Sequence, residues 1–342
     1  VGYSNSFEGR LPLKDLLPNL YTLKEQPQAV PYITNYYADG WGFCIPFEEY
    51  DVLEDGIYTV VVDTEHFDGI LNYAELIIEG DTGEEVFLST YICHPSMANN
   101  ELSGPCVLTF IADWLQSMTA RRYTYRIVFV PETIGSLVYL HERLDELKEK
   151  VVAGFNISCI GDDRCFSYLP SRHGSTPSDI AALHALKWTD PNFIKYSWLE
   201  RGSDERQYCA PGVDLPVASI MRSKYGTYPE YHTSLDDLDN VVTPAGLRGG
   251  FGILKSTIQV LERNYFYRAT VLGEPQLSQR GLYPTVSSKN VKSEARLFID
   301  ILSMADGRTS LIEIVDALNM SVWDVESVIN RLISVGLLER SE

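Results

Sequence analysis

Apolar strand-like runs alternate with helix-like segments through most of this 342-residue sequence, and this alternation limits the fold more than any other feature. Runs rich in Val, Ile and aromatic residues predict buried strands at 86–93, 124–131, 151–161 and 215–223. Helical patterns follow these runs at 103–114, 136–150, 178–189 and 244–266. The alternation predicts an α/β fold with an open, mixed central sheet and helices on both faces.

The edge and the ligand-binding side of this sheet can also be predicted. Residues 74–80 and 85–93 flank an Asp-Thr-Gly-Glu turn, which predicts a β-hairpin. Ligands of open α/β sheets bind at the carboxyl ends of the strands. Polar motifs follow three of the buried runs, so we expect the functional site there.

Composition divides the chain into three regions. Residues 1–70 are rich in aromatic, Pro and turn residues, and we expect an irregular, partly β segment packed on the core. Residues 71–275 form the predicted α/β domain, and clustered Pro, Gly and Ser predict a linker over 269–290. Residues 286–342 predict a small C-terminal winged-helix domain, because three helical patterns there carry N-cap signals at Ser310 and Ser321 and a C-cap signal at Gly336.

The charge of the chain bears on its partners and location. The formal net charge is −19, which repels phosphate backbones, and residues 289–342 hold six Lys/Arg and nine Asp/Glu. We therefore expect no nucleic-acid partner. The six scattered cysteines fit free thiols in a reducing compartment, and no segment has the apolar length of a membrane span. We expect a cytoplasmic protein without a membrane partner; the start at Val1 indicates a trimmed or processed end.

Four segments carry the polar motifs: 91–104, 129–136, 156–161 and 203–237. Taken singly, each has an ordinary structural explanation, such as a helix cap for Glu132 or a loop histidine for His232. Taken together and in this order, they resemble the M28-type co-catalytic zinc aminopeptidase superfamily. The last segment carries the best match, with Ser203-Asp204, Tyr208, Gly212, Pro216, His232-Thr233 and Asp236. More narrowly, the chain resembles a DUF4910-type, aminopeptidase-like group that ends in a winged helix.

The resemblance implies a zinc-exopeptidase-like fold and a metal-dependent hydrolase of peptide or amide bonds. It implies His94 and His232 as metal ligands and Glu132 as the general base. Three carboxylate ligands of the family pattern fall on Asn100, Thr133 and Ser158. A neutral Asn side chain between two zinc ions cannot offset the repulsion of their charges. A standard di-zinc site is therefore not expected.

Three alternatives follow from these departures. A single ion, zinc or manganese, could bind both histidines and one local carboxylate, with Glu101 as the first candidate and Glu132, Asp162 and Asp204 as others. The protein could instead be a catalytically inactive relative that binds a ligand or serves as a scaffold. A metal-free hydrolase could use Cys93 or Ser96 beside His94, which ranks lowest because neighbouring residues on a strand point to opposite faces.

Further residues are expected around the site. We expect Asp236 to orient the imidazole of His232, and Asn100, Ser158 and Tyr231 to line the site. Arg172, His173 and Arg206, with Arg201, Arg222 and Lys224 nearby, either recognise an anionic group or pair with surplus acids. The expected partner is a small substrate that contains a peptide or amide bond, and an acidic winged helix is compatible with a homo-oligomer.

Overall fold

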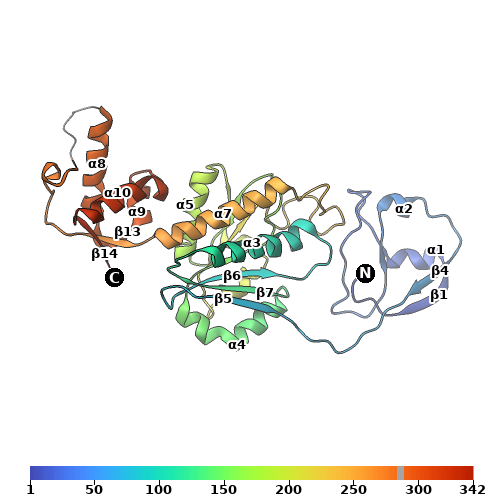
Figure 1. Ribbon diagram of the computed structural model, residues 1–342. Helices are drawn as coiled ribbons and strands as arrows, with labels where there is room; N and C mark the ends of the chain where they lie inside the picture. The colour runs from blue at the N-terminus through green and yellow to red at the C-terminus, as the bar shows by residue number, and fades with distance from the viewer. Residues whose placement is uncertain (283–288, 342) are drawn as a thin grey trace.

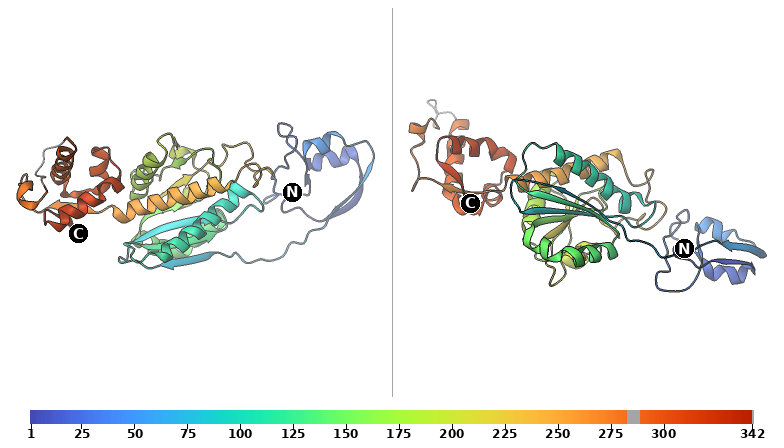
Figure 2. Two further views of the ribbon diagram at one scale, coloured as in Figure 1. Left: turned by 45° about the horizontal axis from the view of Figure 1, so that its top comes forward. Right: turned by 60° about the horizontal axis from the view of Figure 1, so that its bottom comes forward.

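The computed structural model describes residues 1–282 and 289–341, which form three parts in chain order (Figure 1). A central α/β domain lies between an N-terminal part and a C-terminal winged-helix domain, and the two further views show the same arrangement (Figure 2). No helix in the described residues combines the length and apolar character that a membrane span requires.

The central sheet has seven strands in the order β10-β9-β11-β8-β6-β7-β5. Their bounds are β5 (Ala74–Ile78), β6 (Glu85–Tyr91), β7 (Thr124–Val130), β8 (Val151–Asn156), β9 (Ser167–Leu169), β10 (Ile194–Lys195) and β11 (Val217–Met221). Strands β7, β6, β8 and β11 are parallel. Strand β5 runs antiparallel to β7, and β9 runs antiparallel to β11 but parallel to β10. The mixed sheet expected from the sequence is confirmed. The predicted hairpin is wrong, because β7 pairs with both β5 and β6 and lies between them.

Two layers of helices cover this sheet. Helices α3, α5 and α7 lie on one face, and α4 and the short α6 lie on the other (Figure 1). Their bounds are α3 (Ser103–Ser117), α4 (Ile134–Lys150), α5 (Pro177–Thr189), α6 (Glu205–Tyr208) and α7 (Pro244–Arg263). Every residue of β6 is buried, as expected for a central strand covered on both faces. The pairing of Tyr91 with Val130 and of Ser89 with Asn156 brings the carboxyl ends of three strands to one edge.

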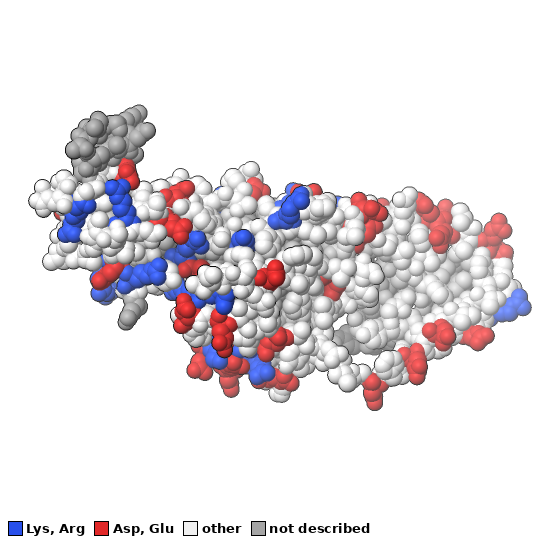
Figure 3. Space-filling model, in the orientation of Figure 1, with Lys and Arg blue, Asp and Glu red and all other residues white. Residues whose placement is uncertain are grey.

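The N-terminal part contains two two-stranded sheets, β1-β4 and β2-β3, and short helices. Its elements are β1 (Phe7–Pro12), α1 (Leu13–Leu16), β2 (Leu20–Tyr21), β3 (Phe43–Cys44), α2 (Phe47–Asp51) and β4 (Ile57–Val62). Residues 1–70 hold 3 Lys/Arg and 12 Asp/Glu, and the face drawn in Figure 3 shows mainly acidic side chains over this part. Residues 26–34 contact the central domain, where Pro31 forms a bridge with Thr233.

The C-terminal domain has a three-stranded sheet in the order β13-β12-β14 and three helices. The bounds are β12 (Phe266–Ala269), α8 (Lys289–Met304), β13 (Asp306–Ser310), α9 (Leu311–Ala317), α10 (Val322–Ser334) and β14 (Leu338–Ser341). Ser310 and Ser321 cap α9 and α10 as predicted. The predicted start at residue 286 lies outside the described residues, and β12 joins this sheet about twenty residues earlier. Phe266 is the last residue of the predicted helix and Ala269 the first of the predicted linker, so nothing local indicated a strand here that pairs with distant strands.

A buried histidine joins the winged-helix domain to the central domain. His184 on α5 contacts Asp316 through Nδ1 at 3.0 Å, and its Nε2 accepts from the backbone N–H of Val322 at 3.1 Å. The second bond requires a neutral ring. Burial lowers the pKa of His184 below its ordinary value of 6.5, and Lys187 acts in the same direction, although Asp316 opposes the change.

We expect this contact to weaken as pH falls below about 6.5. The unfolded chain then binds a proton at His184 that the folded chain excludes, so stability is retained above this pH and lost below it. His184→Gln keeps one donor and one acceptor and should remove this pH-dependent component. Thermal unfolding at pH 7.5 and 5.5 measures it, with the exposed His141→Gln as control. Equal pH responses of the wild type and His184→Gln would contradict the expectation.

Candidate metal site

Three potential metal ligands meet at the carboxyl edge of the central sheet. The Sγ of Cys93, a ring nitrogen of His94 and a carboxylate oxygen of Glu132 all lie within 4.8 Å of one another. Cys93 and His94 follow β6, and Glu132 follows β7, so the parallel pairing of the two strands brings them together. The predicted position of the site at strand ends agrees with this geometry.

The backbone around this group is unusual in several places. Ser96, Thr133, Cys159 and His232 have φ values of 69°, 62°, 48° and 58°, a region that non-glycine residues adopt at an energetic cost. A π-helix, Ala98–Leu102, precedes α3, and such segments are frequent at functional sites. Asn99, Asn100 and Glu101 are buried on it, and the widened turn directs Glu101 back toward the end of β6.

Glu101 lies against His94. Its Oε2 is 3.5 Å from Nδ1 of His94, and its Oε1 accepts from the backbone N–H of Cys93. Burial lowers the pKa of His94, but the close contacts with Cys93 and Glu101 outweigh burial and raise the pKa to about 10. The surroundings of this ring therefore favour a positive charge.

His232 completes an aromatic wall around His94. The two imidazole rings have centroids 4.7 Å apart, and Tyr231 stacks on His232 at 3.9 Å. Burial and the charge of His94 lower the pKa of His232 to about 4, so this ring is neutral and suited to ligation. Tyr32 from the N-terminal part contacts both histidine rings edge-on, at 4.9 and 5.5 Å. No local pattern points to Tyr32, because its partners lie 62 and 200 residues away along the chain.

Several buried polar atoms at the site have no hydrogen-bond partner among the described residues. They include Nδ1 of His94, Oε2 of Glu101, Nε2 of His232, Oδ1 of Asn100 and Oγ of Ser158. Buried polar groups are normally satisfied, and the first three are strong metal donors. These atoms and the preference for positive charge therefore fit one metal ion at His94. Asn100 and Ser158 adjoin it as weaker, neutral oxygen donors.

Glu132 lies in a setting suited to proton transfer. Its Oε1 accepts from Oγ of Ser203 at 3.1 Å. Burial raises the pKa of Glu132 above its ordinary value, while His94 and Ser203 oppose the rise. Asp204 lies behind it and accepts from the backbone N–H of Thr133 at 2.7 Å and from Oγ of Ser136 at 2.9 Å. Burial raises the pKa of Asp204 to about 7, and its contacts hold the turn that carries Glu132.

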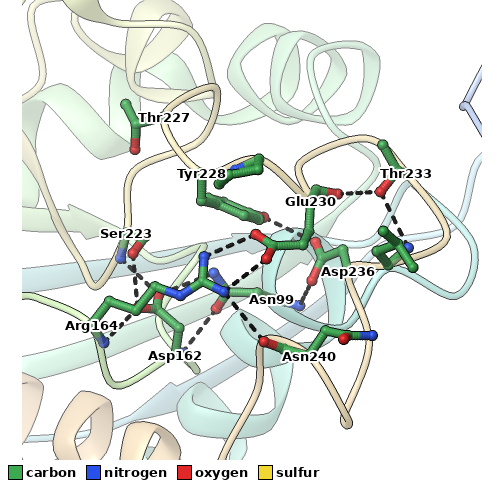
Figure 4. A network of polar contacts seen from close by, with 12 residues as sticks. Asn99, Asp162, Arg164, Ser223, Thr227, Tyr228, Glu230, Thr233, Asp236 and Asn240 are labelled. Atoms are coloured by element: carbon green, nitrogen blue, oxygen red, sulfur yellow. Dashed lines mark hydrogen bonds and ion pairs between the residues drawn. The ribbon is translucent and has the colours of Figure 1, made fainter. Parts of the chain in front are cut away.

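Two further acids, Asp162 and Asp236, belong to a polar network around Asn99 (Figure 4). Asp236 accepts from the backbone N–H groups of Asn99 and Asn100 at 2.7 and 2.9 Å and from the hydroxyl of Tyr228. The expected bond from Asp236 to the imidazole of His232 is therefore not formed; Asp236 holds the π-helix instead. Asp162 accepts from Asn99, Ser223 and Arg164, which leaves no oxygen for a metal.

Of the cationic residues expected around the site, the structure places some away from the metal-binding group and one next to it. Arg172 pairs with Asp214 and donates to the backbone of Cys209, and His173 lies 4.0 Å from the same Asp214, so neither contacts the metal-binding group. Arg206 donates through Nη2 to Oγ1 of Thr133 at 2.7 Å, next to Glu132.

Cys93 and His94 were expected to point to opposite faces of a strand, and the structure contradicts this expectation. Strand β6 ends at Tyr91, so the alternation of side chains stops before residue 93. Cys93 and His94 consequently reach the same cluster. The Pro that follows His94 was the available signal, since a strand rarely continues through proline.

Comparisons with known proteins agree with this architecture. Residues 18–264 match a domain of unknown function, DUF4910, and residues 265–340 match a winged helix-turn-helix family. A Clostridium acetobutylicum protein named "putative polysaccharide biosynthesis protein with aminopeptidase-like domain" is 35% identical over 342 residues, 99% of this chain and 78% of that protein. A crystal structure from Clostridium acetobutylicum, described as a "putative peptidase", has a TM-score of 0.91 and 34% identity, covering 99% of this chain and 77% of that one.

Similarity to a more distant solved structure supports the fold alone. BSAP, a zinc aminopeptidase from Bacillus subtilis, has a TM-score of 0.51 and 14% identity, covering 70% of this chain and 62% of that one.

Proposed function

The chain belongs to the DUF4910 family and ends in a winged helix-turn-helix, and from this membership and the site we propose that it is a metal-dependent hydrolase of peptide or amide bonds. One observation carries the proposal: buried donor atoms of His94, Glu101 and His232 that make no hydrogen bond lie at the same edge of the sheet as Glu132, and two of them, Nδ1 of His94 and Oε2 of Glu101, face each other at 3.5 Å. A purely structural role does not require several buried donor atoms without hydrogen bonds beside a buried carboxylate.

Each residue has a distinct part in the proposal. His94 and His232, with Glu101 or Cys93, hold one ion, zinc or manganese. A bound ion would supply Lewis-acid polarisation of the scissile carbonyl. Glu132 removes a proton from the attacking water and delivers it to the leaving amine, and the hydroxyl of Ser203 orients its carboxylate. Tyr32 and Tyr231 flank the histidine rings and exclude bulk water from them.

Metal content tests this proposal directly. We expect about one zinc or manganese ion per chain in protein purified without chelator. His94→Ala should weaken metal affinity more than about 10-fold, since even changes outside the ligand shell have effects of this size. Elemental analysis and competition with a chromogenic chelator measure both quantities. His141→Ala, an exposed histidine on α4, is the matched control.

A second function is favoured by Asn100 and Ser158, which supply neutral groups beside the site. In this second function the protein binds a ligand at the site and retains the fold without the hydrolytic chemistry. Absence of bound metal, with none taken up at micromolar supply, would replace the hydrolase proposal with this one.

We do not propose a nucleic-acid partner for the winged helix. Ser321 and Val322 begin α10, the helix that would enter a DNA groove, and Val322 donates to His184 of the central domain. Asp324 and Glu326 on α10 add negative charge where phosphates would lie.

A further inference from the structure

Arg206 lies at the site without an acidic partner. Within the described residues its side chain makes one hydrogen bond, to Oγ1 of Thr133, and no ion pair. Other cations of this region are engaged: Arg164 forms a two-point pair with Glu230, and Arg172 pairs with Asp214. In a chain with 47 acidic and 28 basic residues, an arginine without an acid is not explained by surplus acids.

Arg206 lies next to Glu132, the proposed general base. Ser203 lies two residues before α6, and Arg206 lies on α6. Ser203 contacts Glu132, and Arg206 contacts the adjacent Thr133, so the guanidinium lies beside the general base. Burial raises the pKa values of Glu132 and Tyr231, which flank the histidines, and the charge of Arg206 opposes this rise.

We propose that Arg206 binds a carboxylate of the substrate, so that the protein acts on amides that carry an acidic group next to the scissile bond. The reaction named here rests on the proposed hydrolase function, whereas the binding of a carboxylate by Arg206 does not. A guanidinium has five donors, and the single bond to Thr133 leaves a pair of them for a two-point contact with a carboxylate. The exposed side chain can reach solvent and ligand.

The same charge disfavours a free amino terminus at this position. An ammonium group beside a guanidinium suffers like-charge repulsion in a site shielded by aromatic rings. The substrate class therefore differs from that of an enzyme that selects free amines through an acidic rim.

Three small probes test the inference: N-acetyl-Ala-Ala with a free carboxylate, its carboxamide, and Ala-Ala-amide with a free amine. We expect calorimetric titration of the metal-loaded protein to show about 10- to 100-fold tighter binding of the carboxylate probe. Arg206→Ala should abolish this preference, and Arg206→Lys should restore part of it. Arg201→Ala, an exposed arginine stacked on Trp198, should retain the preference.

Binding and turnover separate the two proposals. A carboxylate preference that depends on Arg206 without hydrolysis supports this inference and counts against the hydrolase. Equal binding of the carboxylate probe and its carboxamide, preference for the free amine, unchanged preference in Arg206→Ala, or no binding of any probe at millimolar concentration would overturn it.

Discussion

Glu132→Gln is expected to reduce kcat for amide hydrolysis by about 10²- to 10⁴-fold, the range typical for loss of a general base. Glutamine keeps the size of the side chain and can still accept the hydrogen bond from Ser203. The change therefore removes proton transfer while leaving the local structure in place. Single-turnover and steady-state rates on an acylated peptide or aryl amide measure the effect.

The control for this change is Glu149→Gln, an exposed residue of α4 that should leave kcat unchanged. Metal content should be measured for each variant, because Glu132 lies within ligand distance of Cys93 and His94. Hydrolysis that survives both Glu132→Gln and chelation but fails in Cys93→Ser would point to thiol chemistry and contradict the proposed role of Glu132.

The sequence predicted the sheet and the edge at which the polar motifs gather, because both depend on local signals. Apolar runs define buried strands, and polar motifs directly after them are brought to one edge by parallel pairing. Helix starts at Ser310 and Ser321 were predicted for the same reason, since a cap is decided within four residues. The failed hairpin shows the limit of such signals. The turn between β5 and β6 is compatible with direct pairing, but β7, which follows later in the chain, pairs with both strands and lies between them.

The site was predicted in part. His94, Glu101, Glu132 and His232 come together as a group, and the role of each stays a prediction until metal and activity are measured. Asp236 was assigned to the wrong partner because spacing along the chain does not show which way a carboxylate faces. It supports the backbone of the π-helix, a conformation without a sequence pattern that distinguishes it from an ordinary helix start.

Arg126→Ala is expected to lower the free energy of unfolding by about 3–5 kcal/mol, the cost of leaving buried carboxylates unpaired. Arg126 on β7 is only 1% exposed and contacts Glu85 through two bonds, at 2.5 and 3.0 Å. It also contacts Glu75 at 2.7 Å and Glu146 at 2.8 Å. Alanine leaves Glu85, itself 4% exposed on its side chain, without this partner. Urea denaturation followed by far-UV circular dichroism measures the loss.

The size of the stability loss distinguishes a buried network of ion pairs from an ion pair on the surface. Arg143→Ala removes an exposed contact with Glu146 at 3.8 Å and should cost less than about 1 kcal/mol. Arg126→Met with Glu85→Gln should recover part of the stability, because it removes the uncompensated charge and keeps side-chain volume. Glu85 and Arg126 lie toward the ends of β6 and β7 opposite His94 and Glu132, so metal affinity of the folded protein should not change. A loss below 1 kcal/mol for Arg126→Ala would mean that water or the remaining cation, Lys150, compensates the carboxylates.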